Sequence, residues 1–336
     1  DKIFELATPY VAADIFDLDY VQSADVMTIT HPTYEPRDLT RTDHDAWTLS
    51  TITFAPSQAA PTGVSVSASG GSTTFTYAVT AVNEETLEES LPATGSSSTS
   101  KDAAWDNTVT WVAAAGAGTY NIYREKNGLY GFVGRAEGTS FNDDNIDPNS
   151  ADTPPKARNP FNAVGDYPST VGYHQQRRIF ANTNNATQKF FMSQTGNISN
   201  MSFSSPQKDD DAITVTLASQ QVNEIRHFVS LSDLVILTSG GEWLVQGVDG
   251  VITPSGIQIK PQSYYGSTIL TPIVAGDIVI YMQTGQSVRD LGYKYESDSY
   301  TGNDLSILAR HLFDYNTVLD WSFAQAPHNL IWCVRD

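Results

Sequence analysis

The sequence predicts an all-β protein in which a β-propeller-like platform carries one inserted β-sandwich. Short β-branched runs bounded by turn residues recur along all 336 residues, and 23 Gly and 16 Pro are spread among them. A unit of similar strands repeats along the chain, and one stretch of about 100 residues with its own pattern interrupts the repeat. Hydrophobic residues make up 40% and aromatic residues 11%, which excludes a disordered acidic tail.

Helices are expected at only two places, and both are short. One opens at Thr8, with Pro9 suited to the first helical position, and runs to about Phe16. The other follows Asp304, where apolar residues share one face at three- and four-residue spacing. These residues are Leu305, Leu308 and Leu312.

The repeat is a polar residue that starts a short apolar strand, followed by a polar loop and a second strand such as 242–245 or 287–291. The five anchor residues are Asp25, Arg178, Asp233, Asp277 and Asn329. Their spacings are 153, 55, 44 and 52, and the first becomes 54 when the 99 residues of 57–155 are removed. A period of about 40 to 55 residues with several strands per unit is typical of a β-propeller. The alternative is a β-sandwich whose turn signals recur by chance.

The domain boundaries follow from the repeat. Residues 1–56 are expected to form the first blade, 57–155 the insertion, and 156–336 the remaining blades. The chain begins without a charged-then-apolar leader and stops inside an expected strand. We therefore expect a trimmed piece of a longer protein whose last blade is truncated.

The insertion is bordered by linker-like stretches and contains alternating strands at 74–82, 108–112 and 120–124. A polar loop at 95–100 separates the first of these from the other two. The length of the insertion and its buried-looking Trp111 resemble a fibronectin type III or immunoglobulin-like sandwich. Residues 77–83 look like late strands of such a domain, although they precede the stretch that looks like its early strands. A permuted sandwich is therefore expected, which suits insertion into a loop because both ends must emerge close together.

Charge and cysteine content exclude several classes of protein. There are 38 Asp plus Glu against 19 Lys plus Arg, so the formal charge is −19, which argues against gripping a phosphate backbone. The longest apolar runs, 278–282 and 330–334, fall far short of the ~20 residues that span a bilayer, so no membrane insertion is expected. The single Cys333 excludes a disulfide scaffold and a multi-Cys metal cluster.

No catalytic, cofactor-binding or metal-binding residue is predicted, and no cofactor. The chain has no G-x-S-x-G elbow, Walker loop or H-E-x-x-H. Residues 116–118 form a Gly-Ala-Gly stretch that we interpret as a hairpin turn. The histidines have no ligand spacing and are interpreted as surface or core residues. They are His31, His44, His174, His227, His311 and His328.

One acidic stretch, 142–149, has the alternate Asp143, Asn145 and Asp147 of a calcium loop. An EF-hand needs Gly where Pro148 stands and Glu where Pro154 stands. A capped turn after the last strand of the sandwich is the preferred interpretation.

Two further groups leave a sugar-related function open. Asp209-Asp210-Asp211 precedes an expected strand at 212–217 and is interpreted as a solvated loop, with a glycoside-hydrolysing carboxylate pair as the alternative. Tyr264, Tyr265, Tyr293 and Tyr295 could form a sugar-stacking platform, although packing is the preferred interpretation.

Several stretches together resemble the tail nozzle, or tail tubular protein B, family of short-tailed (podovirus-type) bacteriophages. The resemblance covers most of 1–56 and 160–336, and the sandwich looks like a family-variable insertion. The stretches are 16–27 with His31-Pro32, Pro36-Arg37 and Leu39; 173–178; 238–243; and 287–290 with 309–312.

The resemblance implies a non-enzymatic virion protein, with a propeller subunit in a homohexameric ring at the far end of the tail. It implies contacts with an adaptor or gatekeeper ring and with tail fibres, and passage of phage DNA without specific binding. A charge of −19 suits conducting a duplex that must not be held. Gln22, Asp25 and Arg37 are expected to pair strands and cap turns, while Pro32 and Pro36 hold the loop.

Two other functions remain open. One is a carbohydrate-binding or capsule-degrading tail protein, which would use the acidic or tyrosine groups above. The other is a secreted bacterial adhesin with an immunoglobulin-like module.

Overall fold

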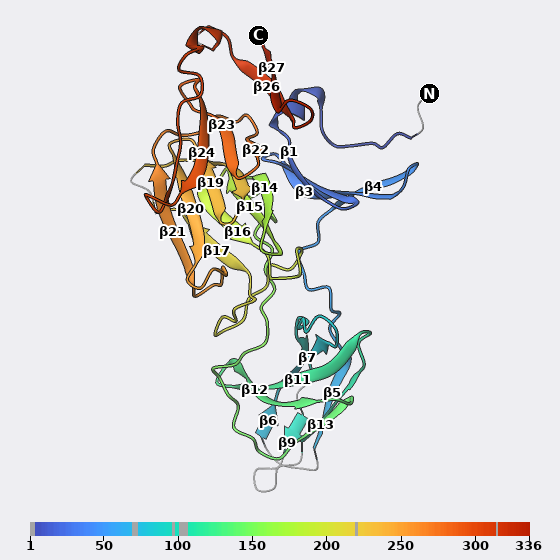
Figure 1. The fold of residues 1–336 in the computed structure, drawn as a ribbon. Helices are drawn as coiled ribbons and strands as arrows, with labels where there is room; N and C mark the ends of the chain where they lie inside the picture. The colour runs from blue at the N-terminus through green and yellow to red at the C-terminus, as the bar shows by residue number, and fades with distance from the viewer. Residues whose placement is uncertain (1–3, 69–72, 96–97, 101–106, 219–220, 314) are drawn as a thin grey trace. The chain divides into compact units, whose positions relative to one another are not determined.

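The structure is a computed structural model that describes residues 4–68, 73–95, 98–100, 107–218, 221–313 and 315–336. It is all-β and divides into two compact units (Figure 1). The larger unit comprises Asp1–Ile52, Phe161–Met192 and Thr214–Asp336. The smaller unit comprises Thr53–Pro160 and Ser193–Ile213.

Among the described residues, the larger unit contains five open antiparallel sheets, and in each the strand order follows the chain. The first sheet consists of β1 (Asp19–Ser23), β2 (Val26–His31), β3 (Tyr34–Asp43) and β4 (Ala46–Thr51). The second consists of β14 (Pro168–His174), β15 (Arg177–Thr183), β16 (Ala186–Met192) and β17 (Ile213–Thr216). The third consists of β18 (Ile225–Ser230), β19 (Leu234–Thr238), β20 (Gly241–Gly247) and β21 (Ile257–Ser263). The fourth consists of β22 (Ile273–Ala275), β23 (Ile278–Met282), β24 (Val288–Lys294) and β25 (Ser299–Thr301). The fifth pairs β26 (Val318–Ala324) with β27 (Leu330–Arg335).

The repeated anchor residues mark equivalent places in these five sheets. Asp25, Asp233, Asp277 and Asn329 each lie in the turn between the first and second strands of a sheet. Arg178 is the second residue of β15, which is also a second strand. The repeat found in the sequence therefore corresponds to a structural repeat.

Successive sheets pack against each other in chain order. Val235 and Leu237 of the third sheet share one core with Val279 of the fourth, and Ile280 of the fourth packs with Trp321 of the fifth. Strand β14 contacts β1 and β2 on one side and β18 on the other. Strand β19 is buried along its whole length, as expected for a strand covered on both faces, whereas β27, the second strand of the fifth sheet, is largely exposed.

A buried ion pair joins the first and second sheets. Arg178 Nη1 donates to both carboxylate oxygens of Asp38, at 3.0 and 3.2 Å, and the Thr28 hydroxyl donates to Asp38 at 2.8 Å. The Arg178 side chain is 1% exposed and the Asp38 side chain 18%. In the sequence, the strands of the smaller unit lie between Asp38 and Arg178, and the ion pair brings these two residues together.

The smaller unit is a sandwich of two sheets with one core. One sheet has the order β13–β10–β5 and the other β12–β11–β7–β8. Val109 and Trp111 of the first sheet pack with Val79, Tyr120 and Ile122 of the second. The strands are β5 (Thr62–Ala68), β7 (Tyr77–Asn83), β8 (Ala93–Thr94), β10 (Asn107–Val112), β11 (Ala117–Lys126), β12 (Leu129–Ala136) and β13 (Ser140–Asp143), with a separate pair β6 (Thr73–Phe75) and β9 (Ser98–Ser100).

The structure corrects two expectations within the sandwich. The single strand expected at 74–82 is two strands, β6 and β7, which pair with different partners. The Gly116 turn, at φ +76°, connects β10 to β11, and these strands belong to different sheets. It is therefore a crossing between the sheets and not a hairpin turn. Part of the expected 95–100 loop lies outside the described residues.

Both expected helices are shorter than the sequence suggested. The first is a 3-10 helix, η1 (Ala12–Asp17), because Asp14 accepts the Val11 N–H and sets the start there. After Asp304 the one helix within 305–313 and 315–336 is η2 (Arg310–Leu312). The Asp304 carboxylate accepts the backbone N–H and hydroxyl of Ser306, a local turn that competes with helix. Neither helix within the described ranges has the length or apolar character to cross a bilayer.

Residues 193–213 cluster with the sandwich, although the sequence division placed them in the platform. Lys156 and Phe203 exchange backbone hydrogen bonds of 2.9 and 3.4 Å, and Thr153 donates from N and Oγ1 to the Ser205 carbonyl. The segment thus pairs with the end of the insertion, which periodicity within either stretch does not reveal.

Candidate functional site

A polar pocket of about 360 Å³ lies in the larger unit where the first strands of four sheets begin. We call it the central pocket. Its lining residues are Phe16, Asp17, Leu18, Asp19, Pro32, Ser169, Asn182, Asn184, Thr187, Glu224, Arg226, His227, Ile269 and Thr271.

The repeated architecture brings these residues together. Asp19 opens β1, Ser169 is the second residue of β14, and Arg226 is the second residue of β18. Ile269 and Thr271 come just before β22. Residues far apart in the sequence therefore meet because equivalent strand ends converge.

Asp19 connects the first and second sheets beside the pocket. Its Oδ2 accepts the Thr170 hydroxyl at 2.6 Å and the Val171 N–H at 3.1 Å. Burial raises the pKa of Asp19 to about 6, although these hydrogen bonds favour the ionised form. The carboxyl group is therefore mostly ionised at pH 7 and takes up a proton a little below that pH.

Glu224, Arg226 and His227 form the wall from the third sheet. Arg226 Nε and Nη2 donate to Glu224 Oε1 at 2.9 and 2.5 Å, and Nη1 donates to the Ser267 carbonyl at 2.6 Å. His227 Nε2 lies 3.2 Å from the Thr268 carbonyl, and burial lowers the pKa of His227 to about 4. At neutral pH the wall thus holds a neutral imidazole and a guanidinium whose Nε, Nη1 and Nη2 are all engaged.

The pocket is acidic and partly apolar. Three carboxyl groups line it, from Asp17, Asp19 and Glu224, against the single cation Arg226. Phe16 adds an aromatic ring that is 86% exposed. This lining is chemically suited to a ligand that brings hydrogen-bond donors, and it disfavours phosphate or carboxylate ligands.

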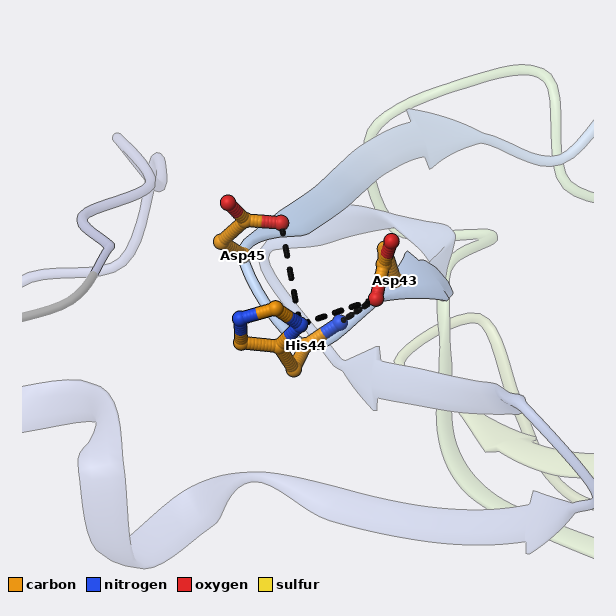
Figure 2. Close-up of side chains that lie close together, drawn as sticks. All are labelled: Asp43, His44 and Asp45. Atoms are coloured by element: carbon orange, nitrogen blue, oxygen red, sulfur yellow. Dashed lines mark hydrogen bonds and ion pairs between the residues drawn. The ribbon is translucent and has the colours of Figure 1, made fainter.

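A second cluster, Asp43, His44 and Asp45, lies at the turn between β3 and β4 (Figure 2). His44 Nδ1 is 2.9 Å from Asp43 Oδ1 and 4.0 Å from Asp45 Oδ1, and all three side chains are exposed. The His44 backbone N–H also binds Asp43 Oδ1, at 2.7 Å. These contacts describe a hydrogen-bonded polar turn, and the cluster alone does not define a metal site.

The calcium-like stretch is organised as the expected capped turn. Asp143 is fully buried, and its Oδ1 accepts the N–H groups of Asn145 and Ile146 at 3.1 and 3.0 Å. Its Oδ2 accepts Arg124 Nη1 and the Tyr77 hydroxyl, both at 2.6 Å. Both carboxylate oxygens therefore hold the sandwich together.

The expectation of a wholly solvated loop at 209–211 is wrong for Asp211. Its side chain is buried, and Oδ2 accepts the N–H groups of Ser204 and Lys208 at 2.8 and 2.9 Å. Asp209 and Asp210 are exposed. Asp211 therefore organises the loop, because a carboxylate can accept several backbone donors at once.

The four tyrosines divide into two kinds. The Arg289 guanidinium lies 3.5 Å from the Tyr265 ring centroid, and the Tyr293 hydroxyl donates to Asp298 at 2.7 Å. Tyr264 and Tyr295 are 77% and 88% exposed. Tyr265 and Tyr293 thus have contacts within the protein, although they are themselves 46% and 50% exposed.

The remaining predicted residues have structural surroundings. His31, His174 and His227 are buried, whereas His44, His311 and His328 are exposed. In the turn after β1, Gln22 Nε2 donates to the Ala24 carbonyl at 2.9 Å, and Asp25 pairs with Arg41 at 3.3 Å. Gln22 therefore caps this turn and Asp25 pairs with a neighbouring strand, as expected.

Neither a scan against protein-family models nor a search of curated proteins finds a match to this chain. Sequence reasoning also missed the central pocket. The first strands share no regular pattern at their starts: β1 opens with Asp19, whereas β22 opens with Ile273 and β26 with Val318.

Proposed function

We propose that the chain is a structural subunit of a bacteriophage tail nozzle, in which the five sheets are consecutive blades of a β-propeller. The observation that carries the proposal is the row of antiparallel meanders that pack in chain order, the first four of which begin at the central pocket. Radial repetition of four-stranded sheets is what defines a propeller. The proposed role in a tail nozzle comes from the resemblance of the blade sequences to the nozzle family.

The smaller unit supports the proposed permuted fibronectin- or immunoglobulin-like insertion. Such domains place the C and F strands side by side in one sheet and the B strand in the other. Here β7 and β11 are neighbours in one sheet, and β10 with Trp111 lies in the opposite sheet. Taking β7 as F, β10 as B and β11 as C puts the late strand first in the chain.

In this proposal DNA passes along the axis of a homohexameric ring, between subunits. The central pocket, at about 360 Å³, is too small for a duplex whose major groove alone is about 12 Å wide. A net charge of −19 opposes prolonged contact with phosphates. The ring would contact an adaptor or gatekeeper ring and tail fibres, and the proposal assigns no reaction to it.

Electron microscopy of phage particles that carry this protein tests the proposal. Six copies in a ring at the end of the tail are expected. Density in a lateral fibre or in the capsid would contradict it.

A reducing-sugar assay on capsular polysaccharide tests the competing function. The buried position of Asp211, with its oxygens engaged by loop donors, argues against the proposed carboxylate pair. No release of reducing ends is expected. Release that is lost in Asp209→Asn would instead establish the enzyme.

A further inference from the structure

We propose that the central pocket binds an organic cation, namely a primary ammonium or guanidinium group at the end of an aliphatic chain. This assignment concerns the larger unit alone and does not depend on a role in a phage tail. Charge, unpaired acceptors and apolar walls each favour this class of ligand.

The first argument is charge. Asp17, Asp19 and Glu224 outnumber the one cation in the lining, and that cation, Arg226, is already paired with Glu224. An anion would meet repulsion from the carboxylates without a free guanidinium to hold it. A cation would gain Coulomb attraction from a partly enclosed acidic wall.

The second argument is the balance of hydrogen-bonding groups. Both hydrogen bonds between Arg226 and Glu224 use Oε1, which leaves Oε2 without a donor among the described residues. Within those same residues no donor reaches the Asp17 carboxylate either. Three of the five Arg226 N–H donors are meanwhile used within the protein. These partly exposed acceptors complement a ligand that brings donors, and an ammonium group carries three and a guanidinium five.

The third argument is the apolar part of the wall. Phe16, which is 86% exposed, offers a ring face to a cation, and Leu18, Pro32 and Ile269 offer surface to methylene groups. The volume of about 360 Å³ lies at the lower end of the range for small-molecule sites. It suits one amino-acid side chain or a short diamine.

This chemistry has two sources, a free diamine or polyamine and a lysine or arginine side chain of another protein. Titration calorimetry on the whole chain separates them with 1,4-diaminobutane in one arm and Nα-acetyl-lysine methylamide in the other. Tighter binding of the diamine indicates a free amine, and tighter binding of the lysine derivative indicates a partner's side chain. If neither binds at 0.15 M salt, the proposal is overturned.

The control ligand is 1,4-butanediol, which has nearly the same shape and no charge. Binding of the diamine without binding of the diol is expected. Equal binding of the two would overturn the proposal, because charge would then not be the recognised property.

Three variants locate the site. Asp17→Asn and Glu224→Gln should each weaken diamine binding about tenfold, and Phe16→Ala should weaken it several-fold. Asp277→Asn is the matched control, since Asp277 is an exposed turn residue outside the lining. Thermal unfolding checks that each variant is folded, and the exposed Phe16 is the position least able to disturb folding. If Asp277→Asn weakens binding as much as Asp17→Asn, the amine is only a counterion of an acidic protein and the proposal fails.

Discussion

Asp19 shows how burial of one carboxyl group couples the stability of the larger unit to pH. Its pKa in the folded protein is about 6, above the value of about 4 for an unfolded chain. The folded state therefore binds the proton more tightly, and this stabilisation is complete below about pH 4 and is lost as the pH rises through 6.

We expect Asp19→Asn to remove this pH dependence. The free energy of unfolding of the natural protein, relative to that of Asp19→Asn, should fall by about 2 kcal/mol between pH 4 and pH 7.5. Urea unfolding of both proteins at the two pH values measures it. His227, with a pKa of about 4, acts in the opposite direction in both proteins and cancels in the difference. If the difference in unfolding free energy between the two proteins is the same at both pH values, Asp19 is not the group that causes the pH dependence.

The buried ion pair of Arg178 and Asp38 should contribute far more to the free energy of unfolding than an exposed ion pair does. Asp38→Ala leaves a buried guanidinium without this carboxylate partner and should cost about 3–5 kcal/mol of unfolding free energy. Asp25→Ala breaks the exposed pair with Arg41 and should cost less than about 1 kcal/mol.

Urea unfolding of Asp38→Ala, Asp25→Ala, Arg178→Met and the double variant Asp38→Ala with Arg178→Met tests this contrast. The double variant should lose less stability than the sum of its two single changes, because it removes the buried guanidinium together with its carboxylate partner. Equal costs for Asp38→Ala and Asp25→Ala would contradict the assigned difference in burial.

At the scale of elements, Glu89 fastens residues 193–213 to the sandwich. It accepts hydrogen bonds from the Thr80 and Tyr123 hydroxyls, both at 2.6 Å, and Lys208 Nζ lies 3.0 Å away. Burial acts to raise the pKa of Glu89, but the Lys208 charge and these hydrogen bonds outweigh it and lower the pKa.

Glu89→Ala should therefore loosen the 193–213 segment. Hydrogen exchange in that segment is expected to accelerate at least tenfold while the β10 and β11 amides stay protected. Lys126→Ala is the control, since Lys126 pairs with Asp147 at the surface of the same unit. Unchanged exchange in Glu89→Ala would show that backbone pairing alone holds the segment.

The sequence predicts a strand best where burial alone determines its residue pattern. Strand β19 could be predicted because it is buried along its whole length and is accordingly an apolar run, Leu234–Thr238. The first strands are less regular, so the convergence of Asp19, Ser169 and Arg226 could not be predicted. The burial of Asp211 depends on contacts within its own folded loop, and composition alone suggested a solvated one.

At the scale of the whole molecule, the acidic charge leads us to expect negligible affinity for duplex DNA. Non-specific binders reach dissociation constants of about 10⁻⁴–10⁻⁶ M at physiological salt through clustered Lys and Arg. This chain has 19 such residues against 38 acidic ones and should bind more weakly than that range. Fluorescence anisotropy with a labelled duplex at 0.15 M salt measures it, and micromolar binding would contradict passage without retention.

We propose that the five sheets are blades in a ring at the tip of a phage tail. Cryo-electron microscopy of particles that carry this protein can locate it. Six copies around the tail axis are expected, each with consecutive blades around a central pocket. Copies located in lateral fibres or the capsid, or sheets stacked without a common centre, would contradict the proposal.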